Sequence, residues 1–151
     1  MAELLAAVAK NVILMSALSA WFIAQVLKTI TSFWKSKEFN AERLVGAGGM
    51  PSSHTSLVVA LASAVAFHDG FDSPLFAVTF VLAAIVMYDA AGVRRAAGKQ
   101  AKVINKLVRE MKVEHTVRDT RLKELLGHTP LEVLAGALLG VVVAYTFSKL
   151  Y

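Results

Sequence analysis

Apolar residues fall into four long stretches that shorter polar segments separate. The first runs over about 11–34, and Lys28 is its only charged residue. The other three cover about 52–67, 74–93 and 131–147. Roughly 20 consecutive apolar residues are enough to cross a bilayer as a helix. The pattern therefore predicts an all-α integral membrane bundle of about four spanning helices, in a single membrane-embedded domain over 1–151.

The segment from about 95 to 112 has a different period. Its apolar residues recur at helical spacing, and basic residues lie between them. The apolar set is Val103, Ile104, Leu107, Val108 and Met111, and the basic set is Lys99, Lys102, Lys106 and Arg109. This pattern is typical of a basic amphipathic helix that lies on a membrane surface or packs on a partner.

Composition supports the membrane interpretation. The chain is 56% hydrophobic and 18% charged, and its mean hydropathy is +0.58. Such a composition excludes a disordered chain and disfavours a soluble domain. The chain has no cysteine, which excludes disulfides, thiol catalysis and thiolate metal sites.

Charge predicts the orientation of the bundle. Of the Lys and Arg residues, 13 lie within 35–43 and 94–123, and only two lie with the termini and the 68–73 turn. Because basic loops stay in the cytoplasm, the first group is expected there. Three polar segments, at 46–55, 89–95 and 127–132, then share the cytoplasmic face, whereas His68 lies on the opposite face.

A glycine-rich segment before Pro51 leads into the first of these polar clusters. A loop followed by a helix N-terminus directs backbone N–H groups at one point and favours an anion there. Ser52 and Ser53 add hydroxyl donors, and His54 adds a group that titrates near neutrality. The alternative is a capped helix start with an interfacial histidine.

The second cluster is the pair His128 and Glu132. Residues four apart on a helix share a face. A carboxylate beside one imidazole nitrogen fixes the tautomer and makes the other nitrogen a better nucleophile or base. The alternative is a helix cap with a polar pair at the membrane edge. Two glycines farther along, Gly136 and Gly140, favour close helix packing.

The third cluster contains Asp89, Arg94 and Arg95. An aspartate near a bilayer is costly unless it is paired or faces water. The arginines could pair with it or bind a phosphate with their planar guanidinium groups, or they could simply be membrane-edge cations. Lys28 either extends to the membrane surface or reaches the same anion site.

Three runs of sequence carry a specific resemblance. They are Gly-Gly-Met-Pro-Ser-Ser-His-Thr, Tyr-Asp-Ala-Ala-Gly-Val-Arg-Arg-Ala-Ala-Gly-Lys-Gln and Leu-Lys-Glu-Leu-Leu-Gly-His-Thr-Pro-Leu-Glu-Val. Together they resemble the divergent branch of the type-2 phosphatidic acid phosphatase superfamily, which also includes vanadium-dependent haloperoxidases. The resemblance extends over nearly the whole chain.

The resemblance implies a lipid-phosphate or lipid-diphosphate phosphatase that needs no metal ion or other cofactor. His128 would be the nucleophile that forms a phosphohistidine, and His54 the general acid. Glu132 would orient His128. Ser52 and Ser53 would hold the phosphoryl oxygens. Expected partners are membrane lipid and a lipid phosphate or phosphate anion, with a homodimer as an option.

The chain also departs from the characterised phosphatases. It lacks their K-x6-R-P motif, for which Lys28 and Arg43 are among the nearest substitutes, and has no Ser-Arg at the usual offset before His128. Arg94 and Arg95 are further candidates for the phosphate cations. Because phosphoryl transfer depends on positive charge around the phosphate, the second hypothesis is a weakly active or inactive anion- or phospholipid-binding scaffold or assembly factor.

Two other functions are disfavoured. Vanadate-dependent halide oxidation would need a vanadate site in an unusually small membrane chain. Nucleic-acid binding rests only on the net charge of +5, and no aromatic stacking platform accompanies the basic residues.

Overall fold

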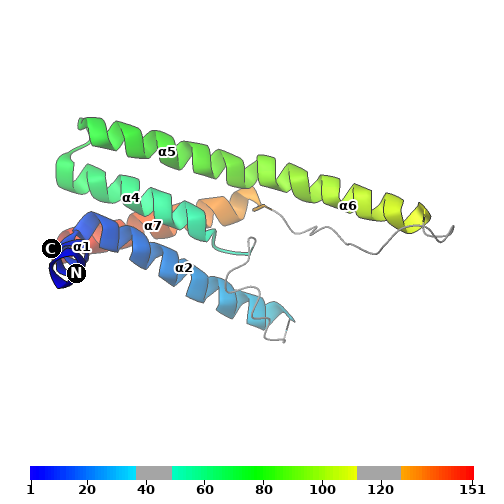
Figure 1. Ribbon diagram of the computed structural model, residues 1–151, viewed down its shortest axis with the longest axis horizontal. Helices are drawn as coiled ribbons and strands as arrows, with labels where there is room; N and C mark the ends of the chain where they lie inside the picture. Colours follow the sequence, from blue (N-terminus) through cyan, green and yellow to red (C-terminus); the bar gives the residue numbers. More distant parts are fainter. Residues whose placement is uncertain (37–48, 112–126) are drawn as a thin grey trace.

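A computed structural model describes residues 1–36, 49–111 and 127–151 of the chain (Figure 1). These residues form helices and no strands. The helices are α1 (Ala2–Lys10), α2 (Val12–Ser36), α4 (Ser53–Asp69), α5 (Pro74–Ala91), α6 (Val93–Met111) and α7 (Pro130–Leu150). The prediction of an all-α membrane bundle is confirmed.

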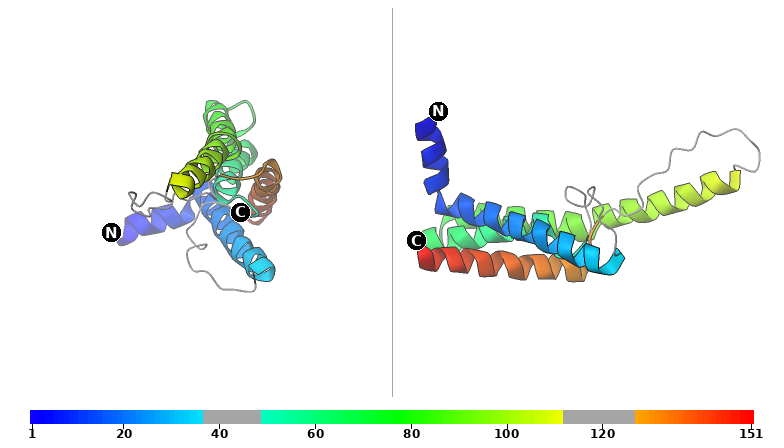
Figure 2. Two further views of the ribbon diagram at one scale, coloured as in Figure 1. Left: turned by 90° about the vertical axis from the view of Figure 1, so that its right-hand side faces the viewer. Right: turned by 90° about the horizontal axis from the view of Figure 1, so that it is seen from below.

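Helix α4 is the centre of the bundle. It packs against α2, α5 and α7, whereas α5 has its main contacts with α4 alone. Both chain ends and the turn between α4 and α5 lie at one end of the bundle, as the charge pattern predicted (Figure 1). Helix α6 extends past the other end, roughly along the direction of α5 (Figure 2).

Within the described residues, three stretches are long and apolar enough to cross a membrane. They are Val12–Trp34, the stretch that begins at Pro74, and Pro130–Leu150. The fourth predicted span corresponds to α4, which has only 17 residues. At 1.5 Å per residue α4 is about 25 Å long, somewhat shorter than the hydrocarbon core of a bilayer. Its central position surrounds it with protein.

Local capping explains where the helices begin. The Ser73 hydroxyl accepts a hydrogen bond from Phe76 N at 3.1 Å, and Pro74 occupies the first turn of α5. Asn11 separates α1 from α2, and its side-chain oxygen accepts from Leu14 N at 3.0 Å. Helix α1 was not expected from the apolar pattern, because its nine residues are too few to span a bilayer.

The distribution of side chains suits a lipid environment. Small residues fill the interior, for example Ala20 and Ala60, both 0% exposed. Large apolar side chains point outward instead, and on α5 Val78 is 65% and Ile85 61% exposed. Lipid is as apolar as these side chains, so helices in a membrane associate through close packing of small residues rather than through burial of large ones.

The closest packing joins α4 to α7 through two glycines. A methyl group on Gly136 would come within 2.5 Å of the Ser52 carbonyl oxygen, and one on Gly140 within 2.8 Å of the Ser56 carbonyl oxygen. Both glycines are buried. The small-residue spacing noted in the sequence therefore lets two helix backbones touch just below the end of the bundle where α4 begins.

Helix α6 has an unexpected distribution of exposure. The predicted apolar face is largely exposed, with Val103 at 59% and Leu107 at 52%, whereas Ala101 and Asn105 are buried. The helix also begins at Val93, two residues before the predicted start. Because α6 follows the direction of α5 (Figure 2), it leaves the bundle instead of lying across its end.

We expect Gly136→Ala to destabilise the bundle. Overpacking against a backbone carbonyl forces the helices apart and costs about 1–3 kcal/mol in the free energy of unfolding. The measurement is thermal unfolding in detergent, followed by the fluorescence of Trp21 and Trp34. Leu138→Ala is the control, since Leu138 is 60% exposed to the lipid side. An unchanged midpoint for Gly136→Ala would contradict the backbone contact.

Candidate functional site

Three segments that are far apart in sequence meet at the end of the bundle where α4 and α7 begin. The backbone N–H of His128 donates to the Ala90 carbonyl at 2.9 Å, which joins α7 to the end of α5. The backbone N–H of Ser52 donates to the Glu132 carbonyl at 3.0 Å, which joins the start of α4 to the first turn of α7. The segments that carry the three predicted polar clusters therefore meet at one end of the bundle.

His128 and Glu132 form a hydrogen-bonded pair in this junction. Nδ1 of His128 lies 3.0 Å from Oε2 of Glu132, and the His128 side chain is only 4% exposed. Since an ionised carboxylate only accepts hydrogen bonds, Nδ1–H must be the donor. In the neutral ring the proton is then on Nδ1, and Nε2 keeps a lone pair.

Glu132 also caps α7. Its Oε2 accepts from Thr129 N at 3.1 Å, and the Thr129 hydroxyl accepts from Glu132 N at 3.3 Å. This reciprocal arrangement is a capping box, with Pro130 in the first turn. The carboxylate that contacts the imidazole therefore also accepts a hydrogen bond from the backbone at the start of α7. Pro130 in the first turn is compatible with the His128–Glu132 hydrogen bond.

Ser52 is the N-cap of α4 and is completely buried. Its hydroxyl accepts from Thr55 Oγ1 at 3.0 Å and from Thr55 N at 3.4 Å. A serine hydroxyl has two acceptor lone pairs and one donor. Thr55 uses both lone pairs, so the chemistry left to the Ser52 hydroxyl is donation.

Helix α2 supports the loop that leads to Ser52. The Thr31 hydroxyl donates to the Met50 carbonyl at 2.9 Å. The stem of Lys28 lies over Gly49, where an added methyl group would come within 2.9 Å of Lys28 Cγ. Gly49 has a φ of +94°, a conformation that side-chain-bearing residues rarely adopt. Lys28 itself is only 3% exposed, so this predicted cation lies inside the bundle beside the loop before α4.

The remaining predicted residues differ in position. Ser53 is 2% exposed, while His54 is exposed in the first turn of α4 and Asp89 is half-buried in the last turn of α5. Arg94 and Arg95 belong to the first turn of α6, but their side chains lie outside the described part of the structure. Arg43 lies outside the described residues altogether.

No metal-binding cluster of three or more His, Asp or Glu side chains is found within residues 1–36, 49–111 and 127–151. The site described above is instead an imidazole–carboxylate pair at the start of α7, next to the N-terminus of α4, and the buried Lys28 lies beside the loop that leads into α4. Helix N-termini and a lysine all favour a bound anion.

Comparison with protein-family models shows the family to which the chain belongs. The model of the divergent PAP2 family matches residues 9–143, which include all three segments that meet in this junction. The chain belongs to the divergent PAP2 family. The resemblance inferred from the sequence motifs is therefore confirmed.

A protein from Bacillus subtilis (strain 168) is similar to this chain. It is described as the uncharacterized membrane protein YuiD and is 44% identical, over 91% of this chain and 96% of its own length. No solved structure matches the chain. The family and this relative support a PAP2-like membrane protein.

Two contributors to the site were missed in the sequence. Thr129 was not recognised as part of a capping box, although Thr-x-x-Glu before an apolar run is a known signature of one. No sequence motif indicated the role of Thr31, because its hydrogen bond to the Met50 carbonyl joins residues that are 19 apart in sequence.

Thr129→Ala and Glu132→Gln separate the two roles of the capping box. Thr129→Ala removes an N-cap and should lower the free energy of unfolding by about 0.5–2 kcal/mol. Glu132→Gln should change it much less, since glutamine also serves in a capping box. Thermal unfolding of both variants in detergent checks this. Equal losses of stability would indicate that the Glu132 charge, rather than the box, holds the start of α7.

Proposed function

We propose that this divergent PAP2 protein hydrolyses a lipid phosphate or lipid diphosphate through a phosphohistidine at His128. The observation that carries the proposal is the hydrogen bond from His128 Nδ1 to Glu132, which leaves Nε2 as the nucleophilic nitrogen of a buried ring. The family relationship supports a PAP2-like membrane protein, and the resemblance implies the roles proposed for His128 and His54.

The reaction has two steps. In the first, the Nε2 lone pair of His128 attacks phosphorus, and the bond from phosphorus to the lipid oxygen breaks. His54 in its protonated form gives a proton to the leaving oxygen, which departs as an alcohol or, from a diphosphate, as a phosphate ester. In the second step, water attacks the phosphohistidine, His54 accepts a proton, and phosphate leaves with the His128 ring restored.

Glu132 is the positioning residue in this scheme. As His128 forms its bond to phosphorus the ring becomes cationic, and a carboxylate 3.0 Å from Nδ1 stabilises that charge. The backbone hydrogen bond from His128 N to Ala90 limits the movement of the ring's own main chain. The ring is thus restrained at both its backbone and its side chain.

Positive potential for the phosphoryl group comes from three sources near this junction. They are the first turn of α4 with the Ser52 hydroxyl as a donor, the start of α7, and Lys28 beside Gly49. Phosphoryl transfer depends mainly on such positioning and charge stabilisation. Arg43, Arg94 and Arg95 stay proposed as further phosphate-binding cations, and Asp89 as a partner for them.

A second candidate function is anion or phospholipid binding without turnover. It is favoured by the small number of enclosed cations, since Lys28 is the one buried lysine or arginine among the residues whose burial is described. Loss of a single charge-stabilising donor can lower a rate by about 10²–10³-fold. A site with few cations would still bind phosphate while turning it over slowly.

The test is phosphate release from a panel of lipid phosphates and diphosphates in detergent, with and without EDTA. We expect release that EDTA does not affect, that His128→Ala abolishes, and that His54→Ala lowers by about 10²–10⁴-fold. Glu132→Gln should lower the rate while the helix cap is kept. His68→Ala, at the opposite end of the bundle, is the matched control with unchanged release.

Two outcomes would contradict the phosphatase. Full turnover by both His128→Ala and His54→Ala would remove the assigned roles. No release from any substrate by folded wild-type protein, together with saturable binding of inorganic phosphate, would favour the binding scaffold.

We also propose that this site faces the cytoplasm, as the excess of basic residues on its side indicates. Because the chain has no cysteine, single cysteines report exposure cleanly. A membrane-impermeant maleimide should label Asp72→Cys in intact cells, since Asp72 lies in the turn at the opposite end. Lys102→Cys on α6 should react only after permeabilisation. The reverse pattern would invert the orientation.

A further inference from the structure

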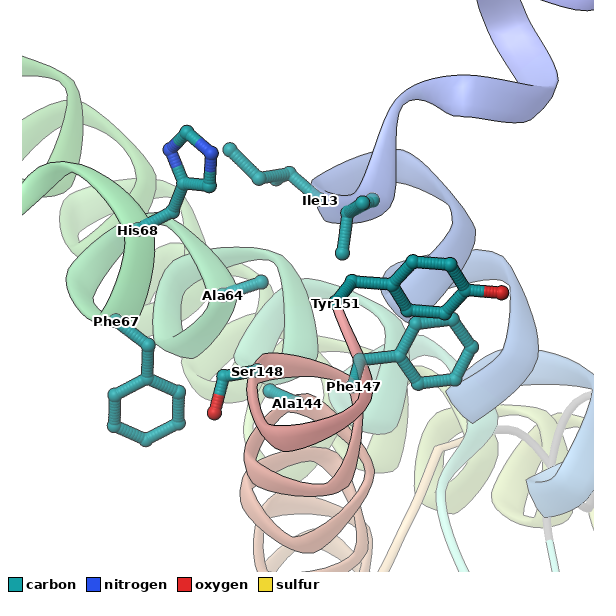
Figure 3. Close-up of a pocket in the computed structure, with 9 residues that line it drawn as sticks. Ile13, Ala64, Phe67, His68, Ala144, Phe147, Ser148 and Tyr151 are labelled. Carbon is teal, nitrogen blue, oxygen red and sulfur yellow. The ribbon is translucent and has the colours of Figure 1, made fainter.

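A cavity lies at the opposite end of the bundle from His128, between the beginning of α2 and the ends of α4 and α7 (Figure 3). Its volume is about 250 Å³. Ligand pockets for drug-sized molecules have about 300–1,000 Å³, so this cavity suits one chain end or one ring rather than a whole lipid.

The cavity exists because the packing of α4 against α7 changes along their length. Near His128 the two backbones touch through Gly136 and Gly140. Toward the other end the rings of Phe67 and Tyr145, which are both exposed, make an edge-to-face contact with their centroids 6.1 Å apart. Ala64 then lines the space with too small a side chain to fill it.

The lining of the cavity is mainly apolar. Ala64 and Ala144 are both buried, and Phe67, Phe147 and Ile13 complete the apolar lining (Figure 3). In a bundle that spans a bilayer, the end of a 25 Å helix such as α4 lies close to a membrane–water interface. A lipid hydrocarbon chain therefore matches the apolar lining of this cavity.

The polar groups of the lining limit the chemistry of that occupant. Nδ1 of His68 lies 2.8 Å from the Asp69 carboxylate, which accepts a hydrogen bond from Nδ1–H, so Nε2 of the neutral ring is an acceptor. The Ser148 hydroxyl donates to the Tyr145 carbonyl at 2.8 Å, which leaves its lone pairs as acceptors. His68 and Ser148 thus have their donors engaged and offer acceptors, while the hydroxyl of Tyr151, which also lines the cavity, points away from both of them (Figure 3).

From these observations we propose that the cavity binds a lipid alcohol. The hydrocarbon lies between α2, α4 and α7, and its hydroxyl donates to His68 or Ser148. Long-chain alcohols, isoprenoid alcohols and glycerides with a free hydroxyl share this chemistry. The site is separate from the proposed phosphatase site and does not depend on its activity.

The experiment uses the full chain in detergent and a hexadecanol that carries a diazirine on its chain. After illumination, mass spectrometry should find adducts at the ends of α4 and α7. Ala64→Phe fills the cavity and should remove most of this labelling. Val142→Phe is the matched control, because it adds the same ring on the lipid-facing side of α7, where Val142 is 59% exposed.

Hydroxyl recognition is tested by competition between an alcohol and an ether of the same chain length. Unlabelled hexadecanol should compete better than its methyl ether, which has no donor, by about 2- to 12-fold, the range expected for one hydrogen bond. His68→Ala should remove most of that preference. His68 is exposed, so this variant does not depend on tolerance of a core substitution.

Three results would overturn the proposal. They are uniform labelling over the lipid-facing helices, unchanged labelling of folded Ala64→Phe, and equal competition by the alcohol and its methyl ether. His128→Ala should be labelled like the wild type. Loss of phosphatase activity and loss of this site are thereby measured separately.

Discussion

The close contact between the backbones of α4 and α7 is the constraint on which the rest of the structure depends. Because Gly136 has no side chain, the Ser52 carbonyl can approach it closely. One turn earlier on α7, the Glu132 carbonyl accepts a hydrogen bond from Ser52 N at 3.0 Å. A larger residue at Gly136 would separate the helices. The α4 N-terminus and the His128–Glu132 pair adjoin each other only because this contact is made.

Glu132 links stability to chemistry at this junction. One carboxylate oxygen accepts from the backbone of Thr129 and from the ring of His128. The helix cap thus fixes the position of the carboxylate, and the carboxylate fixes the tautomer of the ring. An aspartate would have a shorter reach, and the capping box itself favours glutamate or glutamine at this position.

The membrane explains the division between a small-residue interior and a bulky exterior. Alanine, serine and threonine allow α4 to lie among three neighbouring helices, while many of the larger apolar side chains, such as Phe80 and Ile85, face outward. The buried Ser56 hydroxyl finds its acceptor on its own chain segment, because it donates to the Ser52 carbonyl at 2.9 Å. Beyond the Gly136 and Gly140 contacts, small residues such as Ala64 and Ala144 line the cavity at the other end of the bundle.

Apart from α1 and the Thr129 capping box, the sequence by itself determined the helices, their first-turn residues and the shared end of the polar segments. Apolar runs, Ser and Thr caps, prolines in first turns and the glycine pair four residues apart all act over a few residues, and charge along the chain sorts the loops. Tertiary structure decided which groups touch. The hydrogen bond from His128 to Ala90, the burial of Lys28 against Gly49 and the cavity near His68 join segments tens of residues apart. Such contacts depend on how three or four helices pack, and the sequence pattern of one helix carries no record of its neighbour's surface.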